Sequence, residues 1–313
     1  MSTSRFTLYY YYSSFCSQKV LLALFEKDCR FNRKLVNLHT GEQNSPDYMR
    51  INSDGLVPVL KDGEKIIVES DKIIEYIDKE VKSGPKLIPD PNTSADREVQ
   101  RLRNLMADIN VRLLTFGVIA NQELSISGVK MPRIFLKIIS GRSGRDMVTN
   151  LERNAVKYPD LRQAYLTKAE KTRRSIDDAF KKENVVKCLD DTERTFDQLE
   201  ESLQSSQAGV SGKEYWLTGS QFNVADIILA VIMDRLTILG LEDRFFSKSR
   251  RPLLFDYQQR IGQKKSVKML RTEAKKIGPL LLLSGVKSVA PYVGSVAVLA
   301  LAIGAGIWYL KNK

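Results

Sequence analysis

Cys16 lies where a short aromatic segment, residues 6–12, ends and a helical pattern begins. Apolar residues recur at helical spacing over 20–25, and Ser17 is a suitable N-cap for a helix that begins there. The amides and the dipole at a helix N-terminus stabilise a thiolate, which is the nucleophilic form of cysteine. Cys16 is therefore a candidate catalytic nucleophile. The alternative is a small, half-buried residue that does no chemistry.

Two residue pairs further along the chain are candidates for binding a peptide-like ligand. In Val57-Pro58, the proline fixes φ and can adopt the cis bond, which exposes the backbone of the preceding residue. Glu69-Ser70 precedes the helical pattern over 73–77, and helix N-terminal amides together with a serine hydroxyl bind carboxylates. Glu69-Ser70 is also an adequate helix start with an acid favourable to the dipole, and this simpler interpretation stays open.

These candidates must be positioned by strands and helices that alternate in the N-terminal part of the chain. Aromatic and β-branched runs predict the strands, and Asp62-Gly63 predicts a two-residue hairpin turn. The predicted elements are strands over 6–12, 31–38, 56–60 and 66–68, and helices from 17, around 48 and from 70. Their order is βαβαββα.

The following part of the chain is predicted to be helical. Amphipathic spacing predicts one long helix over 93–118 and another, dense in charges, over 166–203. Asn223, with Asp226 three positions later, predicts an N-cap and a capping-box acid before an apolar helix. Residues 122–165 separate the first two helices more widely than a compact helical domain needs.

This order and these motifs resemble the thioredoxin-like N-terminal domain of glutathione transferases. Val57-Pro58 stands where that fold has its cis-proline, and Glu69-Ser70 where a helix N-terminus holds the γ-glutamyl carboxylate of glutathione. Cys16 matches the catalytic cysteine of the omega class, which implies a mixed disulfide with glutathione. The resemblance implies a thioredoxin-like N-terminal domain over 1–83 and an all-helical glutathione-transferase C-terminal domain over 84–262, with an extended insertion around 122–190.

Segments 14–20 and 49–60 narrow the resemblance to the ganglioside-induced differentiation-associated protein 1 family, over nearly the whole chain. That family implies a protein of the outer mitochondrial membrane, also found at peroxisomes, that influences organelle fission, network shape and redox state. The implied partners are membrane lipids and cytosolic or organelle-dynamics proteins, and the implied assembly is a homodimer. The family usually has serine at the position of Cys16, so this chain departs from it in the direction of reactivity.

Residues 288–310 form a stretch without charge that ends three residues before the end of the sequence. A helix of this length reaches about 34 Å, whereas the hydrocarbon core of a bilayer is about 30 Å thick. The stretch predicts a single transmembrane helix that acts as a tail anchor, with the globular part in the cytosol; the alternative is a buried core helix. The residues expected at the membrane surface are Lys287, Trp308, Tyr309, Lys311 and Lys313.

The net charge of +12 is concentrated beside that stretch, because ten of the 49 basic residues but only one of the 37 acidic residues lie from Arg260 onward. A basic cluster next to a membrane span attracts anionic lipid. We therefore expect residues 263–287 to be an interfacial segment, with Lys275 and Lys276 as lipid contacts; packing of its apolar patch 280–283 on the globular part is the alternative. Nucleic acid is the weaker interpretation, because no nucleic-acid-binding motif is present.

Cys16, Cys29 and Cys188 are widely spaced, odd in number and without metal-ligand spacing, as is typical of a reducing compartment. We expect neither a disulfide nor a metal site. Two functions remain open. The first is a tail-anchored adaptor of the mitochondrial outer membrane that regulates fission and redox state. The second is a membrane-tethered glutathione transferase or thiol transferase that uses Cys16.

Overall fold

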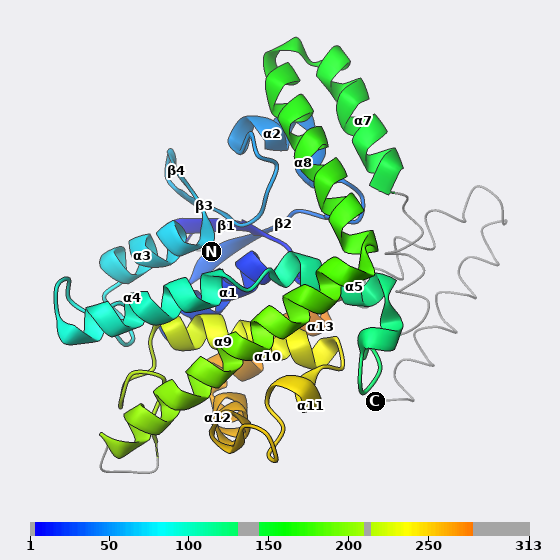
Figure 1. The fold of residues 1–313 in the computed structure, drawn as a ribbon. Helices are drawn as coiled ribbons and strands as arrows, with labels where there is room; N and C mark the ends of the chain where they lie inside the picture. The colour runs from blue at the N-terminus through cyan, green and yellow to red at the C-terminus, as the bar shows by residue number, and fades with distance from the viewer. Residues whose placement is uncertain (1–3, 131–143, 210–213, 278–313) are drawn as a thin grey trace, which may run out of the picture.

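The N-terminal part of the computed structural model is a four-stranded sheet with helices on both faces (Figure 1). The model describes residues 4–130, 144–209 and 214–277. The elements are β1 (Phe6–Tyr10), α1 (Phe15–Glu26), β2 (Phe31–Leu35), the 3-10 turn η1 (Glu42–Asn44), α2 (Pro46–Ile51), β3 (Val59–Asp62), β4 (Lys65–Val68) and α3 (Ser70–Glu80). The predicted order βαβαββα is confirmed, with η1 as an addition before α2.

The sheet has the strand order β2-β1-β3-β4, in which β1 and β2 are parallel and the other pairs antiparallel. Successive residues of β1 face opposite sides, so Leu8 packs in the core under α1 and α3, whereas Tyr9 packs with Tyr48 of α2 on the other face. The sheet is therefore covered on both sides. This arrangement is that of a thioredoxin-like domain.

The rest of the described chain is helical. Its elements are α4 (Ser94–Ala107), α5 (Val111–Ala120), η2 (Gln122–Leu124), α7 (Gly144–Lys157), η3 (Pro159–Leu161), α8 (Arg162–Phe180), α9 (Lys182–Ala208), α10 (Val224–Ile238), α11 (Glu242–Phe245), α12 (Pro252–Gln263) and α13 (Lys265–Lys275). The most buried helix is α10, and the predicted capping box of Asn223 and Asp226 at its start is confirmed.

Both long helices predicted from the sequence are divided in the structure. The expected helix over 93–118 is α4 and α5, because the Asn110 side chain accepts a hydrogen bond from the Leu113 N–H at 3.0 Å and starts a new helix. The expected helix over 166–203 is α8 and α9, because Lys181 leaves the helical conformation at φ −86°, ψ 102°. Apolar periodicity continues across both breaks, which is why the pattern did not reveal them.

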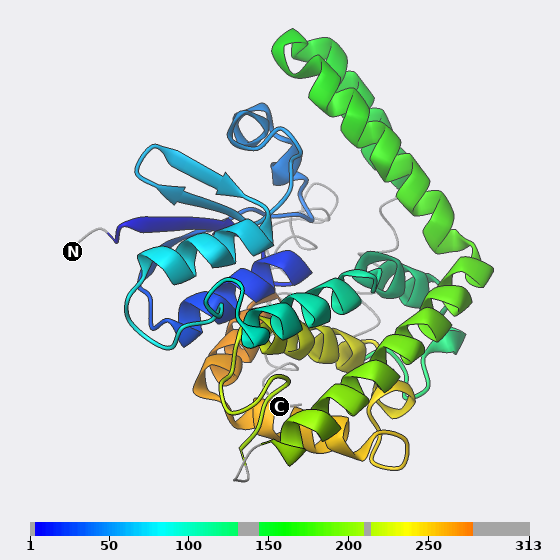
Figure 2. The ribbon, with the colours of Figure 1, turned by 60° about the vertical axis from the view of Figure 1, so that its left-hand side comes forward.

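The expected insertion contains a helical hairpin of α7 and α8 that stands beside the sheet domain (Figure 2). Its buried core, which includes Leu151 and Tyr165, encloses Met49 of α2. The Tyr165 hydroxyl donates a hydrogen bond to the Asn44 carbonyl at 2.8 Å. The hairpin is therefore docked on the N-terminal domain.

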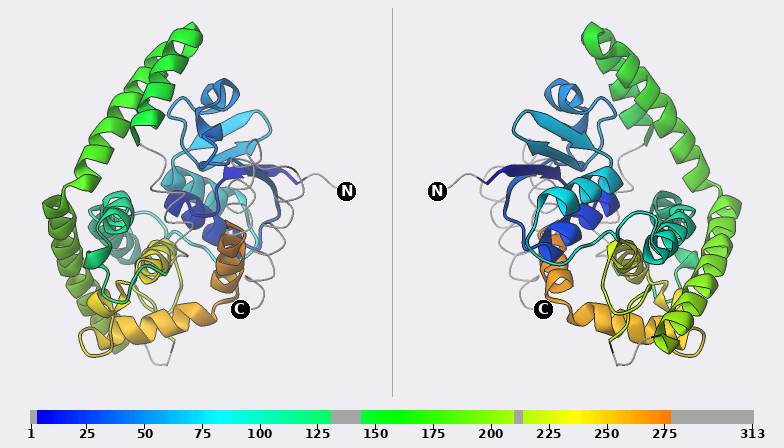
Figure 3. Two further views of the ribbon diagram at one scale, coloured as in Figure 1. Left: turned by 90° about the vertical axis from the view of Figure 1, so that its right-hand side faces the viewer. Right: turned by 90° about the vertical axis from the view of Figure 1, so that its left-hand side faces the viewer.

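The helix α13, which begins the segment expected to be interfacial, packs against α1 (Figure 3). Its buried Glu273 accepts a hydrogen bond from the Tyr10 hydroxyl at 2.5 Å, and Arg271 pairs with Asp234 of α10 at 2.7 Å. Lys275 and Lys276 are exposed. One face of α13 thus joins it to the protein, and these two lysines lie on the solvent side.

The predicted membrane span 288–310 and the apolar patch 280–283 lie outside the described residues. The same holds for the predicted membrane-surface residues Lys287, Trp308, Tyr309, Lys311 and Lys313. Among the residues that the structure describes, no helix is both long enough and apolar enough to cross a bilayer.

Candidate functional site

Cys16 occupies the first turn of α1. The N-cap is Ser14, whose hydroxyl oxygen accepts a hydrogen bond from the Ser17 N–H at 3.3 Å, so the expectation that Ser17 caps this helix is wrong. Ser17 instead accepts a hydrogen bond from the Tyr11 N–H at 3.3 Å and ties the turn to the preceding strand. The earlier start places Cys16, which is partly exposed, among the free amides of the helix N-terminus.

The peptide bond between Val57 and Pro58 is cis, as the resemblance implied. The carbonyl of the preceding residue, Leu56, is occupied by hydrogen bonds from the Tyr48 hydroxyl at 2.7 Å and from the Asn52 amide at 2.9 Å. Within the described residues, the Val57 backbone makes no hydrogen bond. Buried backbone groups need partners, so Val57 presents an N–H and a carbonyl that a peptide-like ligand can satisfy.

Glu69 and Ser70 form the start of α3. Glu69 has φ 70°, ψ 117°, a left-handed conformation that a residue other than glycine rarely adopts. Such strain persists where the surrounding structure enforces it and is concentrated at binding sites. Ser70 is buried, and its hydroxyl has no hydrogen-bond partner within the described residues. The hydroxyl and the first amides of α3 are suited to bind a carboxylate.

The sheet brings these three parts together at one edge. Val59 pairs with Tyr9 of β1 and with Val68 of β4, so the end of β1, Pro58 before β3, and Glu69 after β4 are neighbours. Lys19 of α1 forms an ion pair with Asp71 of α3 at 3.0 Å and joins the two helix starts. Sequence reasoning had selected all five residues, Cys16, Val57, Pro58, Glu69 and Ser70, and the fold gathers them.

Arg235 of α10 is a site residue that sequence reasoning missed. Its Nη2 donates a hydrogen bond to the Ser13 carbonyl at 2.6 Å, and its Nη1 donates one to the Thr115 hydroxyl at 3.2 Å. Burial lowers the pKa of Arg235 to about 10, and the charge of Cys16 acts in the opposite direction. Nothing in the local sequence distinguished Arg235, because only the packing of the two domains places α10 behind the Cys16 turn.

Lys168 of α8 is a second residue that was missed. Its ammonium donates hydrogen bonds to the carbonyls of Asp54 at 3.1 Å and Gly55 at 2.5 Å, in the loop that leads to Pro58. Burial, together with the charge of the nearby Arg112, lowers the pKa of Lys168 to about 8. Gly55 has φ 59°, and a Cβ there would lie 2.7 Å from the Gln43 carbonyl oxygen, so this position requires glycine.

The other two thiols are remote from this edge. Burial raises the pKa of both Cys29 and Cys188. A raised pKa leaves less thiolate at neutral pH, and the thiolate is the nucleophile. The arrangement at the sheet edge can therefore bind a peptide with a free α-carboxylate and place it next to one cysteine.

Two protein-family models match the chain. The model described as glutathione S-transferase, N-terminal domain, covers residues 13–80, and the one described as glutathione S-transferase, C-terminal domain, covers residues 157–264. The first match contains Cys16, Val57, Pro58, Glu69 and Ser70, and the second contains Lys168 and Arg235. The helices α4 and α5 lie between the two matches.

Relatives among characterised proteins confirm the narrower resemblance. The chain is 27% identical over 261 residues to human ganglioside-induced differentiation-associated protein 1-like 1, with 82% of this chain and 71% of the human protein covered. It is 26% identical over 266 residues to tetrachloro-P-hydroquinone reductive dehalogenase of Sphingobium chlorophenolicum, with 85% and 95% covered.

Solved structures share the fold. The crystal structure of beta-etherase LigF from Sphingobium sp. strain SYK-6 superposes with a TM-score of 0.64 at 21% identity, covering 86% of this chain and 99% of that one. Glutathione transferase URE2P8 from Phanerochaete chrysosporium, solved with oxidized glutathione, gives a TM-score of 0.57 at 18% identity, covering 88% and 97%.

Proposed function

Since the chain belongs to the glutathione S-transferase family, with both of its domains present, we propose that it binds glutathione at the sheet edge and exchanges thiols with it at Cys16. The observation that carries the proposal is the set of polar groups without a protein partner that the sheet brings to the same end as Cys16. The Val57 backbone, the Ser70 hydroxyl and the start of α3 match a tripeptide that ends in an α-carboxylate at its γ-glutamyl residue.

The proposed reaction is a thiol–disulfide exchange. The Cys16 thiolate attacks the glutathione sulfur of a mixed disulfide, the S–S bond breaks, and the partner sulfur leaves as a thiolate that takes a proton from water. A second glutathione thiolate then attacks the Cys16–glutathione disulfide. This step releases oxidised glutathione and restores the Cys16 thiolate. Glutathione is the reductant, and no other redox group is needed.

The first test measures ligand binding. Isothermal titration with glutathione and with oxidised glutathione should detect binding by the wild-type protein. Ser70→Ala should weaken it about tenfold or more, because a hydrogen bond to a charged group contributes about 1.5–3 kcal/mol. Ser249→Ala, at an exposed position far along the chain, is the matched control and should leave affinity unchanged. Absence of binding in the wild type, or equal affinity in both variants, would contradict the proposal.

The second test measures the covalent step. Oxidised glutathione should modify Cys16 before Cys29 and Cys188, which intact-mass and peptide mass spectrometry can follow. Cys16→Ser should abolish the exchange while preserving binding, since serine is nearly the same size and tolerated at a helix start. Exchange that persists in Cys16→Ser would remove this cysteine from the mechanism.

A second function, that of a tail-anchored adaptor of the mitochondrial outer membrane, with peroxisomes as a further location, is supported by a different observation. The exposed side of α13 and β2 forms a surface hollow of about 560 Å³ lined by Arg33, Lys265, Lys268 and the exposed Met269. Basic and apolar groups side by side suit an anionic membrane surface. Most of the residues that line the hollow belong to α13, which comes shortly before segment 278–313 in the sequence. This second proposal includes partners in organelle fission and a homodimer, which the resemblance to the ganglioside-induced differentiation-associated protein 1 family implies.

Topology separates this function from a purely soluble enzyme. Protease added to intact mitochondria should remove the globular domains and leave a small fragment with the 288–310 stretch in the membrane. Protection of the globular domains from protease would rule out the cytosolic orientation. Recovery of the intact chain in the soluble fraction would rule out the anchor.

A further inference from the structure

We propose that Arg235 is the counter-ion of the Cys16 thiolate, a positioning residue that keeps this sulfur charged and poised for exchange. The inference deepens the thiol exchange proposed above and rests on it for its biological role. Its geometry, however, stands on the described residues alone and involves no glutathione.

The guanidinium of Arg235 contacts the turn that leads to Cys16. Arg235 reaches from α10 across the domain boundary, and its 2.6 Å hydrogen bond is to the carbonyl of Ser13, three residues before Cys16. Ser13 directly precedes the N-cap Ser14, so the contact fixes the turn from which the thiol projects. The 3.2 Å hydrogen bond to Thr115 holds the guanidinium from the side of α5.

The positive charge of Arg235 has no carboxylate partner among the described residues. Within the described residues, no carboxylate forms an ion pair or hydrogen bond with Arg235, and both of its hydrogen-bond acceptors are neutral oxygens. The neighbouring Asp234 is committed to Arg271 at 2.7 Å. The Arg235 Nε is buried and has no partner. Arg235 as a residue is partly exposed, but buried polar atoms such as its Nε normally have a partner, and one that lacks it in a native fold requires an explanation.

Two cations, Lys19 and Arg235, lie near the Cys16 turn. Lys19 on α1 is compensated by Asp71 on α3 at 3.0 Å, which leaves Arg235 on α10 as the cation without a carboxylate. Burial lowers the pKa of Arg235, and the charge of Cys16 opposes this shift in part. Ionisation of Cys16, three residues after the Ser13 carbonyl that Arg235 binds, supplies an anion at this turn.

The pairing has a consequence for the exchange reaction. In the mixed disulfide with glutathione, the Cys16 sulfur is neutral and Arg235 again lacks an anion. Attack by a second glutathione thiolate restores the Cys16 thiolate and the pair. Arg235 therefore favours both the attacking form of Cys16 and its role as a leaving group in the second step, because thiols with a stabilised thiolate leave faster.

The decisive experiment measures the alkylation rate of each cysteine against pH in the full-length protein, with iodoacetamide and peptide mass spectrometry. In Arg235→Met, alkylation of Cys16 at neutral pH should slow severalfold, because the thiolate loses a nearby positive charge. Arg235→Lys keeps the charge and should restore most of the wild-type profile. The profiles of Cys29 and Cys188 should not move. An unchanged Cys16 profile in Arg235→Met would overturn the inference.

A second experiment uses only the wild-type protein, so its outcome does not require any variant to fold. The ratio of the iodoacetate rate to the iodoacetamide rate reports the local charge, because the first reagent is an anion and the second is neutral. That ratio should be higher at Cys16 than at Cys29 and Cys188, and equal ratios at the three cysteines would contradict the pairing. Since no glutathione is present in either assay, loss of glutathione binding would refute the proposed function without affecting this result.

Discussion

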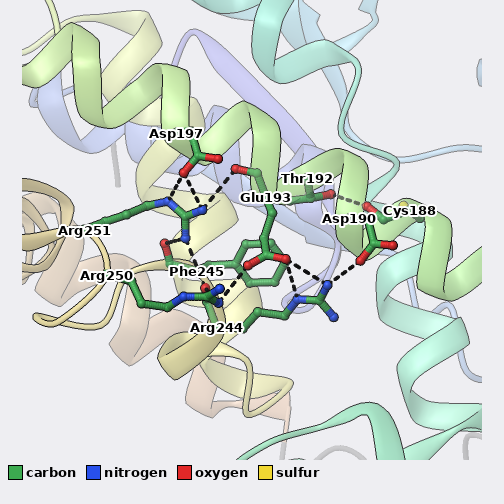
Figure 4. A network of polar contacts seen from close by, with 9 residues as sticks. All are labelled: Cys188, Asp190, Thr192, Glu193, Asp197, Arg244, Phe245, Arg250 and Arg251. Atoms are coloured by element: carbon green, nitrogen blue, oxygen red, sulfur yellow. Dashed lines mark hydrogen bonds and ion pairs between the residues drawn. The ribbon is translucent and has the colours of Figure 1, made fainter.

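Arg235 on α10, which is partly buried, and Arg251 directly before α12, which is buried, have opposite surroundings. Arg251 donates hydrogen bonds to Asp197 at 2.6 and 2.9 Å and to the carbonyls of Arg244 and Phe245 at 3.1 and 3.0 Å (Figure 4). Beside it, Glu193 pairs with Arg244 at 2.9 Å and with Arg250 at 2.7 Å. Arg235 has only two neutral oxygens and a buried Nε without a partner.

The difference indicates that the charge of Arg251 serves the stability of the fold, whereas that of Arg235 is available to an anion. The network around Arg251 satisfies its own donors and fixes α9 against the start of α12, so it needs nothing from outside. Around Arg235 the same kind of group is left incomplete next to a thiol. Buried polar groups that lack partners in a native fold require an explanation, and binding of an anion supplies one.

The largest expected effect on the free energy of unfolding comes from removing Arg251, whose donors are hydrogen-bonded within the protein. Arg251→Met should lower the free energy of unfolding by about 3 kcal/mol, because the carbonyls of Arg244 and Phe245 both lose a donor, whereas Asp197, whose side chain is 62% exposed, is solvated by water. Arg235→Met should cost much less, since it removes a charge that the fold does not satisfy. Denaturant unfolding of the two variants measures both. A cost at Arg235 equal to that at Arg251 would break the comparison.

An acid on the helix of Arg235 provides the next effect. Asp226 is fully buried at the start of α10, and burial raises its pKa to about 6 from 3.8. Because the folded state binds the proton more tightly than the unfolded state, the stability from this group is present below about pH 4 and is lost as pH rises through 6. Two pKa units correspond to about 3 kcal/mol as an upper bound.

Asp226→Asn checks this sign. The variant cannot titrate, so its free energy of unfolding should depend less on pH between 4 and 7 than that of the wild type. The mean stability will also fall, because Asp226 accepts hydrogen bonds from the Leu217 N–H at 2.9 Å and the Tyr257 hydroxyl at 2.5 Å. The slope against pH, rather than the absolute value, is therefore the quantity to compare. Identical slopes would refute the assignment.

The sequence predicted what local patterns encode. The order of strands and helices in the N-terminal part, the start of α3 and the capping box at Asn223 follow from residues that are neighbours in the chain, and the cis-proline followed from the family resemblance. Helix ends were less predictable. The divisions at Asn110 and Lys181 depend on how α5 and α8 turn toward other elements, and apolar spacing carries no record of such turns.

Residues that enter the site from distant segments could not be predicted. Arg235 reads as an ordinary polar position in an apolar helix, and Lys168 as one of many charges on a long amphipathic helix. Their roles arise because α10 packs against α1 and because the α7–α8 hairpin docks on the loop at Gly55. Only long-range packing makes these contacts, and a single sequence does not specify it residue by residue.

The smallest expected effect compares the cysteines that accompany the two arginines. Cys188 lies on α9 beside the saturated network, where its thiol faces the Asn110 carbonyl at 3.8 Å and burial raises its pKa (Figure 4). Cys16 lies at the N-terminus of α1, near Arg235, which has no carboxylate partner among the described residues. At pH 7, Cys16 should therefore alkylate at least about tenfold faster than Cys188, since each pKa unit changes the thiolate fraction tenfold below the pKa.

Cys29 sharpens this last comparison, because it is partly exposed yet also has a pKa raised by burial. If exposure alone controlled the rate, Cys29 would react as fast as Cys16. If local charge controls it, Cys29 should react at a rate closer to that of Cys188. Timed alkylation followed by peptide mass spectrometry ranks the three thiols in one sample, and denaturing the protein should equalise them. A rank in which Cys29 matches Cys16 would mean that access, not the unpaired cation, determines reactivity at this site.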